Sequence, residues 1–489
     1  MEKIVYAKNG MVSAEVAGQP LHSRYDPLSE ARKFVKTLPL TGEERVFILM
    51  ECGLGYIIPF IRERAAKYGT QPFIVSLHAS DFFLSGNLPP DFSTSTDVEK
   101  SVSAEWSPSC GNLADFLEAR IPLTEARRVK IIEWRPARAA YGAAYLAIVG
   151  ETAAFIKSIE AGRRTLNFFG KRWFLNILYN ASNISKVVIP QKKARNNCVV
   201  CASGPSLEAA LPILRRAQES GKSPLVFAAS SALPALNNAG VTPDLVVTSD
   251  GGNWALLHLA EFVRYAGYRR DDSRRVPLAY PLHAALSSSA LRFSVFPFAV
   301  NQVESLMLRS AGLPVFLLPE SGTVSAAALD LALGLSDGKV YVCGMDFKTR
   351  DIQTHTRPYL FDIMAGAKST RTSPWYTRRF ERALGMREGG SLDVYARWFE
   401  RYEREHKERV FQFSEFKPEQ NTEKLTWQDV NAVRALNERG LGRVVIEEIR
   451  REPEGAVCRE VSELLFEGGE PHGIEEIEDK IVGLLKKHG

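Results

Sequence analysis

The 489-residue sequence contains few cysteines and few histidines, six and eight respectively. Six cysteines in a chain of this length suit a reducing compartment. Cys198 and Cys201 have the spacing of redox and zinc motifs, but both lie in an apolar stretch and no second cysteine pair accompanies them. We therefore interpret them as small side chains buried in a sheet.

The sequence also lacks a strong excess of either charge and a long apolar run. The net charge of +5, from 62 basic and 57 acidic residues, is too small for a dedicated nucleic-acid-binding protein. The most apolar stretches, 47–61 and 141–156, contain Glu51 and Glu151, so neither a membrane span nor a secretory signal is expected. We therefore expect a cytoplasmic protein. Its length, with 45% hydrophobic and 24% charged residues, allows two or three cores.

The most informative stretch is the apolar run Cys198–Ala202, which continues into Ser203-Gly204-Pro205-Ser206. A strand that turns directly into a helix presents backbone N–H groups to an anion above the strand. Gly204 allows close approach, Pro205 suits a first helical turn, and the hydroxyl of Ser206 can cap the helix. The stretch predicts a phosphate-binding turn, although Gly-Pro-Ser also begins helices that bind nothing.

The arrangement of an apolar strand followed by small or acidic residues recurs along the chain, in 225–231, 245–253, 315–323 and 339–346. A helix predicted over Val324–Leu335 separates the last two. This pattern predicts an α/β fold with a doubly wound, Rossmann-like parallel sheet, whose ligands bind at the carboxyl edge of the strands. The predicted nucleotide- and donor-binding residues at that edge are Ser203, Gly204, Pro205, Ser206, Ser230, Ser231, Asp250, Ser321, Gly322, Thr323 and Asp346.

Four segments organise the chain. Residues 1–135 form a smaller N-terminal α/β domain, with strands at 45–50 and 72–77 and a helix near 57–68. Its Gly53-Leu-Gly55 turn is interpreted as structural, because the second strand ends without the acidic residue of a dinucleotide site. Residues 136–190 form a helical connector, 191–400 the central domain and 401–489 a mostly helical C-terminal region.

The central motifs resemble those of the motility-associated factor (Maf) family of flagellin glycosyltransferases. The resemblance rests on Ala-Ser-Gly-Pro-Ser-Leu at 202–207, Thr242-Pro243-Asp244, Ser321-Gly322-Thr323-Val324 and Cys343-Gly344-Met345-Asp346-Phe347. The segment 165–173 with Asn176 and Asn180, and the Gly-Leu-Gly-Tyr turn at 53–56, extend it. The central domain is also similar to bacterial sialyltransferases and to archaeal-type hydroxymethyl-dihydropterin diphosphokinases.

The Maf resemblance implies transfer of a nonulosonic, sialic-acid-like sugar from a cytidine-monophosphate (CMP)-activated donor to serine or threonine hydroxyls of flagellin. It thus implies a role in flagellar assembly and motility. An enzyme of this kind must hold the leaving phosphate and deprotonate an acceptor hydroxyl. No redox cofactor is expected.

His355 is the predicted catalytic base. It lies in the loop 348–359, just beyond the strand tip at Asp346, and an imidazole titrates near neutral pH. A histidine in the corresponding loop is found in the family; the alternative is a surface histidine. Arg350, Arg357 and Tyr359 are expected to neutralise the phosphate or carboxylate of the donor, and Asn301 either binds the ligand or caps a helix.

Two alternative functions remain. In a diphosphokinase, Asp250 would coordinate Mg²⁺ between ATP phosphates, so a magnesium requirement stays open, with Asp250 as its ligand if there is one. The flanking domains favour a protein acceptor over this reaction. The third possibility is a non-catalytic, nucleotide-binding flagellar assembly factor.

Overall fold

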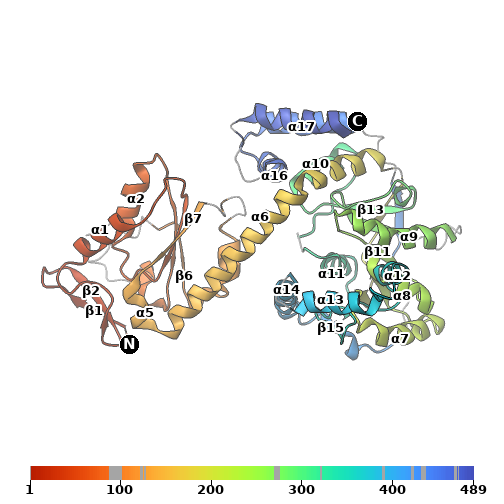
Figure 1. Ribbon diagram of the computed structural model, residues 1–489, viewed down its shortest axis with the longest axis horizontal. Coiled ribbons are helices and arrows are strands. Elements are labelled where there is room, and N and C mark those ends of the chain that lie inside the picture. The colour runs from red at the N-terminus through yellow and green to blue at the C-terminus, as the bar shows by residue number, and fades with distance from the viewer. Residues whose placement is uncertain are drawn as a thin grey trace. The chain divides into compact units, whose positions relative to one another are not determined.

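The computed structural model describes residues 2–87, 102–121, 125, 128–184, 186–268, 276–319, 322–387, 391–419, 423–430, 437–466, 471 and 473–488. The chain forms two compact units, Met1–Leu166 and Asn167–Gly489, which are described separately (Figure 1). Their boundary falls within helix α6 (Ala143–Asn183). The predicted connector, 136–190, is therefore mostly one long helix that contributes to both units.

The first unit contains a parallel sheet whose described strands follow the order β6-β5-β4-β7. All five residues of β4 are buried, because strands pair with it on both sides and its sequence is a continuous apolar run. Both predicted strands and the predicted helix are confirmed. The strands of the sheet and its helices are β4 (Val46–Met50), β5 (Phe73–Leu77), β6 (Ala104–Trp106), β7 (Val129–Glu133), α1 (Pro27–Thr37), α2 (Ile58–Ala66), α4 (Leu113–Glu118) and α5 (Arg135–Tyr141).

A small antiparallel sheet precedes this core, formed by β1 (Glu2–Tyr6), β2 (Val12–Val16) and β3 (Gln19–Pro20). The side chain of Trp134, which follows β7, donates a hydrogen bond to the carbonyl of Leu21 at 2.7 Å. This bond ties the antiparallel sheet to the parallel one within the first unit.

In the second unit, nine described strands form one sheet in the order β15-β14-β9-β10-β11-β12-β13-β8-β16. All neighbours are parallel except β16 and β8. The strands are β8 (Val187–Pro190), β9 (Cys198–Cys201), β10 (Leu225–Ala229), β11 (Leu245–Val247), β12 (Leu278–Pro281), β13 (Val295–Phe298), β14 (Val340–Cys343), β15 (Val410–Gln412) and β16 (Trp427–Val430).

Helices cover both faces of this sheet (Figure 1). Cys198 and Val200 of β9 belong to the same buried cluster as the alanine-rich helix α11 (Val324–Leu335). Val199 and Cys201 alternate with them, point to the opposite face and are equally buried. The doubly wound, Rossmann-like fold predicted from the sequence is therefore confirmed, as are the buried positions of the two cysteines.

The sheet extends beyond the predicted limits of 191–400. Strand β8 precedes them, and β15 and β16 come from the region expected to be mostly helical. Each of the latter lies at an edge of the sheet and pairs on one side, so its sequence need not be apolar. The predicted strand at 315–318 is only a single bridge from Leu317 to Ala299.

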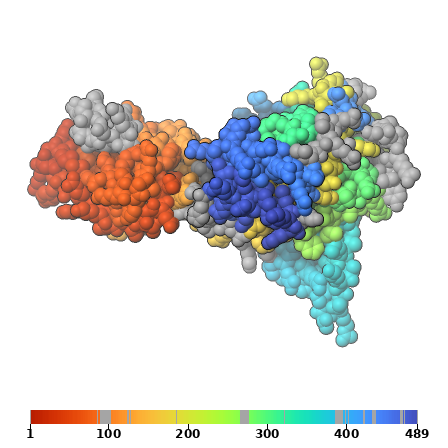
Figure 2. Space-filling model, turned by 90° about the horizontal axis from the view of Figure 1, so that it is seen from above, coloured from red at the N-terminus to blue at the C-terminus, as the bar shows by residue number. Residues whose placement is uncertain are grey.

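The second unit contains further helices around the sheet. They are α7 (Leu207–Glu219), α8 (Leu233–Ala239), α9 (Leu256–Tyr268), α10 (Gln302–Ser310), α12 (Leu360–Ala367), α13 (Trp375–Arg387), α14 (Ser391–Glu405), α15 (Glu438–Arg451), α16 (Ala456–Leu465) and α17 (Ile474–His488). Figure 2 shows the cyan residues around α12 and α13 projecting from the rest of this unit. The two helices follow directly on the loop that contains His355.

Candidate functional site

The order of the strands reverses at β9. From β9 the chain builds β10 to β13 on one side, and it then returns to place β14 on the other side of β9. In open parallel sheets, ligands bind at such a point, outside the carboxyl ends of the strands. The loops after β9 and β14 therefore form the centre of the candidate site.

The turn after β9 is tied to the loop after β14. The amide of Gly204 donates to the carbonyl of Gly344 at 2.8 Å, and the amide of Ser206 donates to Oδ2 of Asp346 at 2.8 Å. The expectation that these two amides are free for a phosphate is therefore wrong. Asp346 itself supplies the negative charge that the N-terminus of α7 attracts.

The hydroxyl of Ser206 does not cap α7 as expected. It accepts a hydrogen bond from the amide of Gly344 at 3.0 Å, and thus joins the two loops. A Cβ atom at Gly204 would lie 2.3 Å from Oδ2 of Asp346 and 2.5 Å from the carbonyl oxygen of Gly344. Glycine is thus required at this position by the packing of the two loops, and the adjacent Pro205 is buried.

The two serines after β10 lie in different surroundings. The hydroxyl of Ser231 donates to the hydroxyl of Ser203 at 2.9 Å, which brings both to the edge of the sheet. Ser230 is only 2% exposed. Of the predicted pair, Ser231 is thus the one that a ligand can reach.

The loop that contains His355 packs on the turn after β9. The amide of Thr356 donates to the carbonyl of Ser203 at 2.8 Å, and its hydroxyl donates to the carbonyl of Gly204. The side chain of Gln353 donates to Oε1 of Glu208, on α7, at 2.7 Å. These bonds bring the predicted base to the edge of the sheet next to the turn.

Arg357, in the loop that contains His355, is held by Glu208 of helix α7. Its Nε atom lies 3.2 Å from Oε1 of Glu208, and its side chain is 59% exposed. Desolvation of Glu208 acts in the opposite direction, but hydrogen bonds from Arg357 and Gln353 lower the pKa of Glu208 below its usual value. Arg357 is therefore engaged by a protein carboxylate, in contrast to its expected role as an anion ligand.

His355 stacks on Tyr359, with ring centroids 3.9 Å apart and an interplanar angle of 3°. Its Nδ1 atom lies 2.9 Å from the hydroxyl oxygen of Thr354. Burial, assisted by the positive charge of Arg382, lowers the pKa of His355 to about 4. The imidazole is therefore neutral at physiological pH and can accept a proton, but it is a weaker base than an exposed histidine. Burial also raises the pKa of Tyr359, so its hydroxyl stays protonated.

A second histidine, His258 on α9, approaches the same aromatic group. Its ring centroid lies 5.7 Å from that of Tyr359 and 5.2 Å from that of Phe361. Burial lowers the pKa of His258, and the charge of Asp250 opposes this effect. His258 is not among the residues predicted from the sequence, although its position in the first turn of the helix after the strand tip at Asp250 is a usable signal.

Asp250 is exposed at the tip of β11, and three consecutive carbonyls, from Ser249 to Gly251, hold its loop in place. The carbonyl of Ser249 lies 3.1 Å from Nε2 of His283, that of Asp250 accepts from the amide of Ala285, and that of Gly251 accepts from Nδ2 of Asn176. Oδ1 of Asp250 accepts from the amide of Gly252 at 2.7 Å. The aspartate is thus presented by a fixed backbone.

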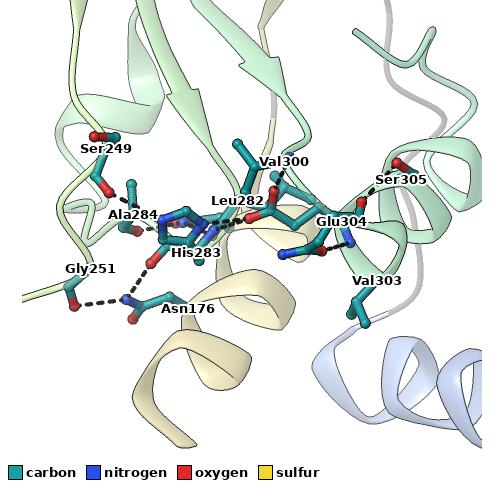
Figure 3. A network of polar contacts seen from close by, with 12 residues as sticks. Asn176, Ser249, Gly251, Leu282, His283, Ala284, Val300, Val303, Glu304 and Ser305 are labelled. Carbon is teal, nitrogen blue, oxygen red and sulfur yellow. Dashed lines mark hydrogen bonds and ion pairs between the residues drawn. The ribbon is translucent and has the colours of Figure 1, made fainter. Parts of the chain in front are cut away.

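Asn176 and Asn180 lie one turn apart on α6 and bind the loop after β12, and Figure 3 shows Asn176. Asn176 donates to the carbonyl of His283 at 2.9 Å, and Asn180 donates to the carbonyls of Leu282 and Ala284 at 2.7 and 2.8 Å. The asparagines that contribute to the family resemblance therefore have a structural task within the second unit.

Glu304 is completely buried on α10 and is satisfied by its neighbours. It accepts from the amides of His283 and Val300 at 2.7 and 2.8 Å, and its Oε1 atom lies 2.9 Å from Nδ1 of His283 (Figure 3). Because the carbonyl of Ser249 can only accept, Nε2 of His283 carries a hydrogen. The pair fixes the loop before Asp250 through a buried polar network.

The turn before α11 only partly matches its prediction. Thr323 caps α11 by accepting from the amide of Ala326 at 3.1 Å, and Asn301 caps α10 in the same way. Gly322 has φ of +68°, and a Cβ there would lie 3.2 Å from the ring of Tyr395. Ser321 lies outside the described residues. Burial, with the charge of Asp250, raises the pKa of Tyr395.

In the first unit, the Gly53-Leu-Gly55 turn is closed by side chains. Oε1 of the buried Glu51 accepts from the amide of Gly53 at 3.2 Å, and Nε2 of His22 accepts from the amide of Leu54 at 3.0 Å. These acceptors take the amides that would face a phosphate in a dinucleotide site. The geometry agrees with the structural interpretation of this turn.

Among the described residues, no group of three or more histidine, cysteine, aspartate or glutamate side chains is placed to hold a metal ion. A magnesium ion at Asp250 remains a prediction. Among the described helices, none combines the length and apolar character needed to cross a membrane.

Comparison with known proteins gives the following similarities. The model of the family described as 6-hydroxymethylpterin diphosphokinase MptE-like matches residues 171–351. Two proteins of Treponema pallidum (strain Nichols), both described as uncharacterized, are similar in sequence. One is 24% identical over 324 residues, which cover 65% of this chain and 67% of the relative. The other is 28% identical over 149 residues, which cover 29% of this chain and 38% of the relative.

Among solved structures, the chain is similar to the Maf glycosyltransferase from Magnetospirillum magneticum AMB-1. The TM-score is 0.48 at 14% sequence identity, over 71% of this chain and 60% of that chain. The chain thus spans less than two thirds of that protein. The two descriptions, Maf glycosyltransferase and MptE-like diphosphokinase, are those of the families that the sequence motifs resemble.

Proposed function

We propose that this chain is a glycosyltransferase that moves a nonulosonic sugar from a CMP-activated donor to a serine or threonine hydroxyl of flagellin. The observation that carries the proposal is a neutral histidine, His355, stacked on Tyr359 beside the turn at which the strand order reverses. A neutral imidazole at the ligand-binding edge is suited to accept the proton of a hydroxyl. The motif resemblance to the Maf family supplies the donor and acceptor classes.

In the proposed reaction, the acceptor oxygen forms a bond to the anomeric carbon of the sugar. The bond from that carbon to the phosphate oxygen breaks, and CMP leaves with the electron pair. His355 takes the hydroxyl proton. Since Nδ1 lies 2.9 Å from the Thr354 hydroxyl, we assign this proton to Nε2. Ser203, Ser231 and Asp250 line the edge at which the nucleotide is proposed to lie.

The proposed compartment is the cytoplasm, where the donor and newly made flagellin would meet. All six cysteines are free thiols, which is typical of a reducing compartment. The proposed biological role is the glycosylation that precedes flagellar assembly.

A diphosphokinase activity is the second candidate, and the MptE-like family match over 171–351 favours it. That match includes Asp250, the predicted magnesium ligand, but it ends before His355. The two candidates therefore depend on different parts of the edge. A non-catalytic assembly factor is the third possibility.

The deciding experiment incubates the purified full chain with flagellin and CMP-N-acetylneuraminate as the donor probe, followed by intact-protein mass spectrometry. A mass increase equal to the sugar, with release of CMP, is expected. A parallel reaction contains ATP, Mg²⁺ and 6-hydroxymethyl-dihydropterin. Formation of AMP there, with no change of flagellin, would favour the diphosphokinase, and inactivity in both would favour the assembly factor.

A further inference from the structure

Two arginines share one aspartate immediately after the loop of the candidate base. The amide of Asp362, in the first turn of α12, donates to the carbonyl of Tyr359 at 3.0 Å. Nη1 of Arg382 lies 3.0 Å from Oδ1 of Asp362, and Nε of Arg379 lies 3.6 Å from Oδ2. Each carboxylate oxygen thus faces a different guanidinium, and both guanidiniums come from one face of α13.

Asp362 and Arg379 are largely shielded from water, and Arg382 is partly exposed. The side chains of Asp362, Arg379 and Arg382 are 9%, 11% and 31% exposed. Two positive charges against one negative charge leave an excess of one positive charge in these contacts. Burying a charge without an equal opposite charge is costly, and the ring of Trp375, 4.6 Å from the guanidinium of Arg379, offsets only part of this cost. An anion is the group that would complete the cluster.

The cluster is also close to the proposed chemistry. His355 stacks on Tyr359, and Tyr359 precedes α12 directly. The charge of Arg382 reaches both side chains electrostatically. By contrast, Arg357, the arginine expected to bind the anion, is bound to Glu208. The arginine pair on α13 is therefore better placed to receive a charged group beside the base.

We propose that Arg379 and Arg382 bind the anionic group of the sugar donor, with Asp362 balancing one of the two positive charges. This inference rests on the proposed glycosyltransferase function and assigns it a substrate-binding pair. The ligand chemistry is a carboxylate or phosphate oxygen pair, which the planar guanidinium can bind through two hydrogen bonds. The two sources in the donor are its sugar carboxylate and its nucleotide phosphate.

Binding of an anion by the arginine pair is expected to change the pKa of His355. The positive charge of Arg382 contributes to the low pKa of His355, together with burial and the neighbouring His258. A bound anion offsets that charge, so the pKa of His355 rises when the donor is present. The base becomes stronger in the complex that needs it and stays weak in the free enzyme.

The test compares Arg382→Gln with Arg378→Gln in the full chain. Arg378 is an exposed residue of the same helix, and its Nε atom lies 3.3 Å from the hydroxyl of Ser373. Calorimetry measures the affinities for cytidine, CMP and CMP-N-acetylneuraminate. Loss of a charged hydrogen bond should weaken the relevant complex by about tenfold or more in Arg382→Gln and leave Arg378→Gln unchanged.

The three ligands show whether the arginine pair binds the sugar carboxylate or the nucleotide phosphate. If the pair binds the sugar carboxylate, only CMP-N-acetylneuraminate loses affinity. If it binds the phosphate, CMP loses affinity as well, and cytidine does not. Unchanged affinities for all three in Arg382→Gln would overturn the proposal.

Asp362→Asn separates anion binding from simple support of the loop. This variant keeps the shape of the side chain and raises the excess positive charge, so anion binding should be equal or tighter. If the arginines only held Asp362 in place, Asp362→Asn would lose affinity as Arg382→Gln does, and the proposal would fail. NMR titration of His355 adds a second readout: its pKa should rise in Arg382→Gln, and in the wild type when inorganic phosphate is added.

Failure of the proposed function is distinguishable from failure of this inference. If no CMP compound binds the wild type, inorganic phosphate becomes the probe. Stabilisation of the wild type by phosphate, and its loss in Arg382→Gln, would keep the anion site while rejecting the donor class. Equal stabilisation of both proteins, or none of either, would reject the site.

Discussion

Oδ2 of Asp346 accepts a hydrogen bond from the amide of Ser206 at 2.8 Å and so places a carboxylate at the N-terminus of α7. The two residues lie at the tips of adjacent strands, β14 and β9. A helix N-terminus is a common position for the phosphate of a ligand. In this protein a side chain occupies it, so the phosphate of the proposed nucleotide must either displace Asp346 or bind further along the edge.

Replacement of Gly204 by alanine should destabilise the second unit. The new Cβ would lie 2.3 Å from Asp346 and 2.5 Å from the backbone of Gly344, so two loops must move apart. Overpacking of this kind costs about 1–3 kcal/mol of the free energy of unfolding. Urea unfolding of the full chain measures the effect.

Gly334→Ala is the matched control for this substitution. Gly334 is an exposed residue of α11 with no atom within 4 Å of an added Cβ, so alanine should leave stability equal or slightly higher. A Gly204→Ala protein as stable as the wild type would show that the two loops separate freely.

Replacement of Asp346 by alanine should have two effects. Loss of the bond to Ser206 should lower the free energy of unfolding by about 1 kcal/mol, as for other helix caps. The vacated amide should then bind an external anion. Phosphate, compared with chloride at equal ionic strength, should therefore raise the thermal unfolding temperature of Asp346→Ala more than that of the wild type. Equal responses would show that the turn does not attract anions.

The buried centre of the sheet is readable from the sequence because parallel strands with neighbours on both sides form continuous apolar runs. Strands β9, β10, β11 and β14 follow this rule, and α11 has the predicted bounds. Strand β13 is also an apolar, buried run, but Pro297, which cannot donate to the ladder, argues against a central strand in the sequence. Strands β15 and β16 are short edge strands, and their pairing depends on contacts distant in sequence.

The candidate site was predictable as a set of strand tips but not as a set of contacts. The loops after parallel strands gather at one edge, so Ser203, Asp250 and Asp346 could be grouped without coordinates. Which of these side chains form hydrogen bonds with one another depends on the three-dimensional fold. Ser206 and Asp346 are 140 residues apart, and Arg357 finds Glu208 149 residues away. Arg382 was not predicted as a site residue. Its position near the loop of His355 depends on its contact with Asp362, and thus on how α12 and α13 pack.

If the proposed function holds, His355 should determine the acid limb of the transfer reaction. Its pKa in the free enzyme is lowered to about 4 by burial and Arg382, so the base stays unprotonated down to that pH. The profile of kcat/KM should thus fall near pH 4, well below the value of about 6.5 for an unperturbed imidazole. His355→Ala should lower the rate by roughly 10²–10⁴-fold.

The control for this prediction is Arg382→Gln, which should move the acid limb of kcat/KM to higher pH, because the positive charge near His355 is removed. A rate profile that is unchanged in His355→Ala would assign the proton transfer to another group. His258, which shares the aromatic cluster, is the next residue to replace.

Two buried histidines should limit the stability of the first unit at opposite ends of the pH scale. Burial lowers the pKa of His22 to about 3, so between that value and 6.5 only the unfolded chain binds its proton. The free energy of unfolding therefore decreases as pH falls through this range. Although desolvation opposes the shift, the carboxylates of Glu105 and Glu51, 3.7 and 3.6 Å from the ring nitrogens, raise the pKa of His78 to about 9. The stabilisation from His78 is present below pH 6.5 and is lost as pH rises through 9.

Hydrogen exchange of the full chain between pH 4 and 9.5, corrected for the intrinsic exchange rates, tests both limbs on peptides that contain β4 and β5. Protection should be greatest near pH 6.5, about the pKa of an unperturbed histidine.

His22→Asn should reduce the loss of protection on the acid side, because no buried neutral imidazole remains, and should leave the alkaline loss unchanged. His78→Gln should lower protection at all pH values and remove the alkaline slope, since Glu51 and Glu105 then lose the charge between them. If protection rose steadily from pH 6.5 to 9.5 in the wild type, the prediction for His78 would be wrong. His78 would then be neutral in the folded unit, between Glu51 and Glu105.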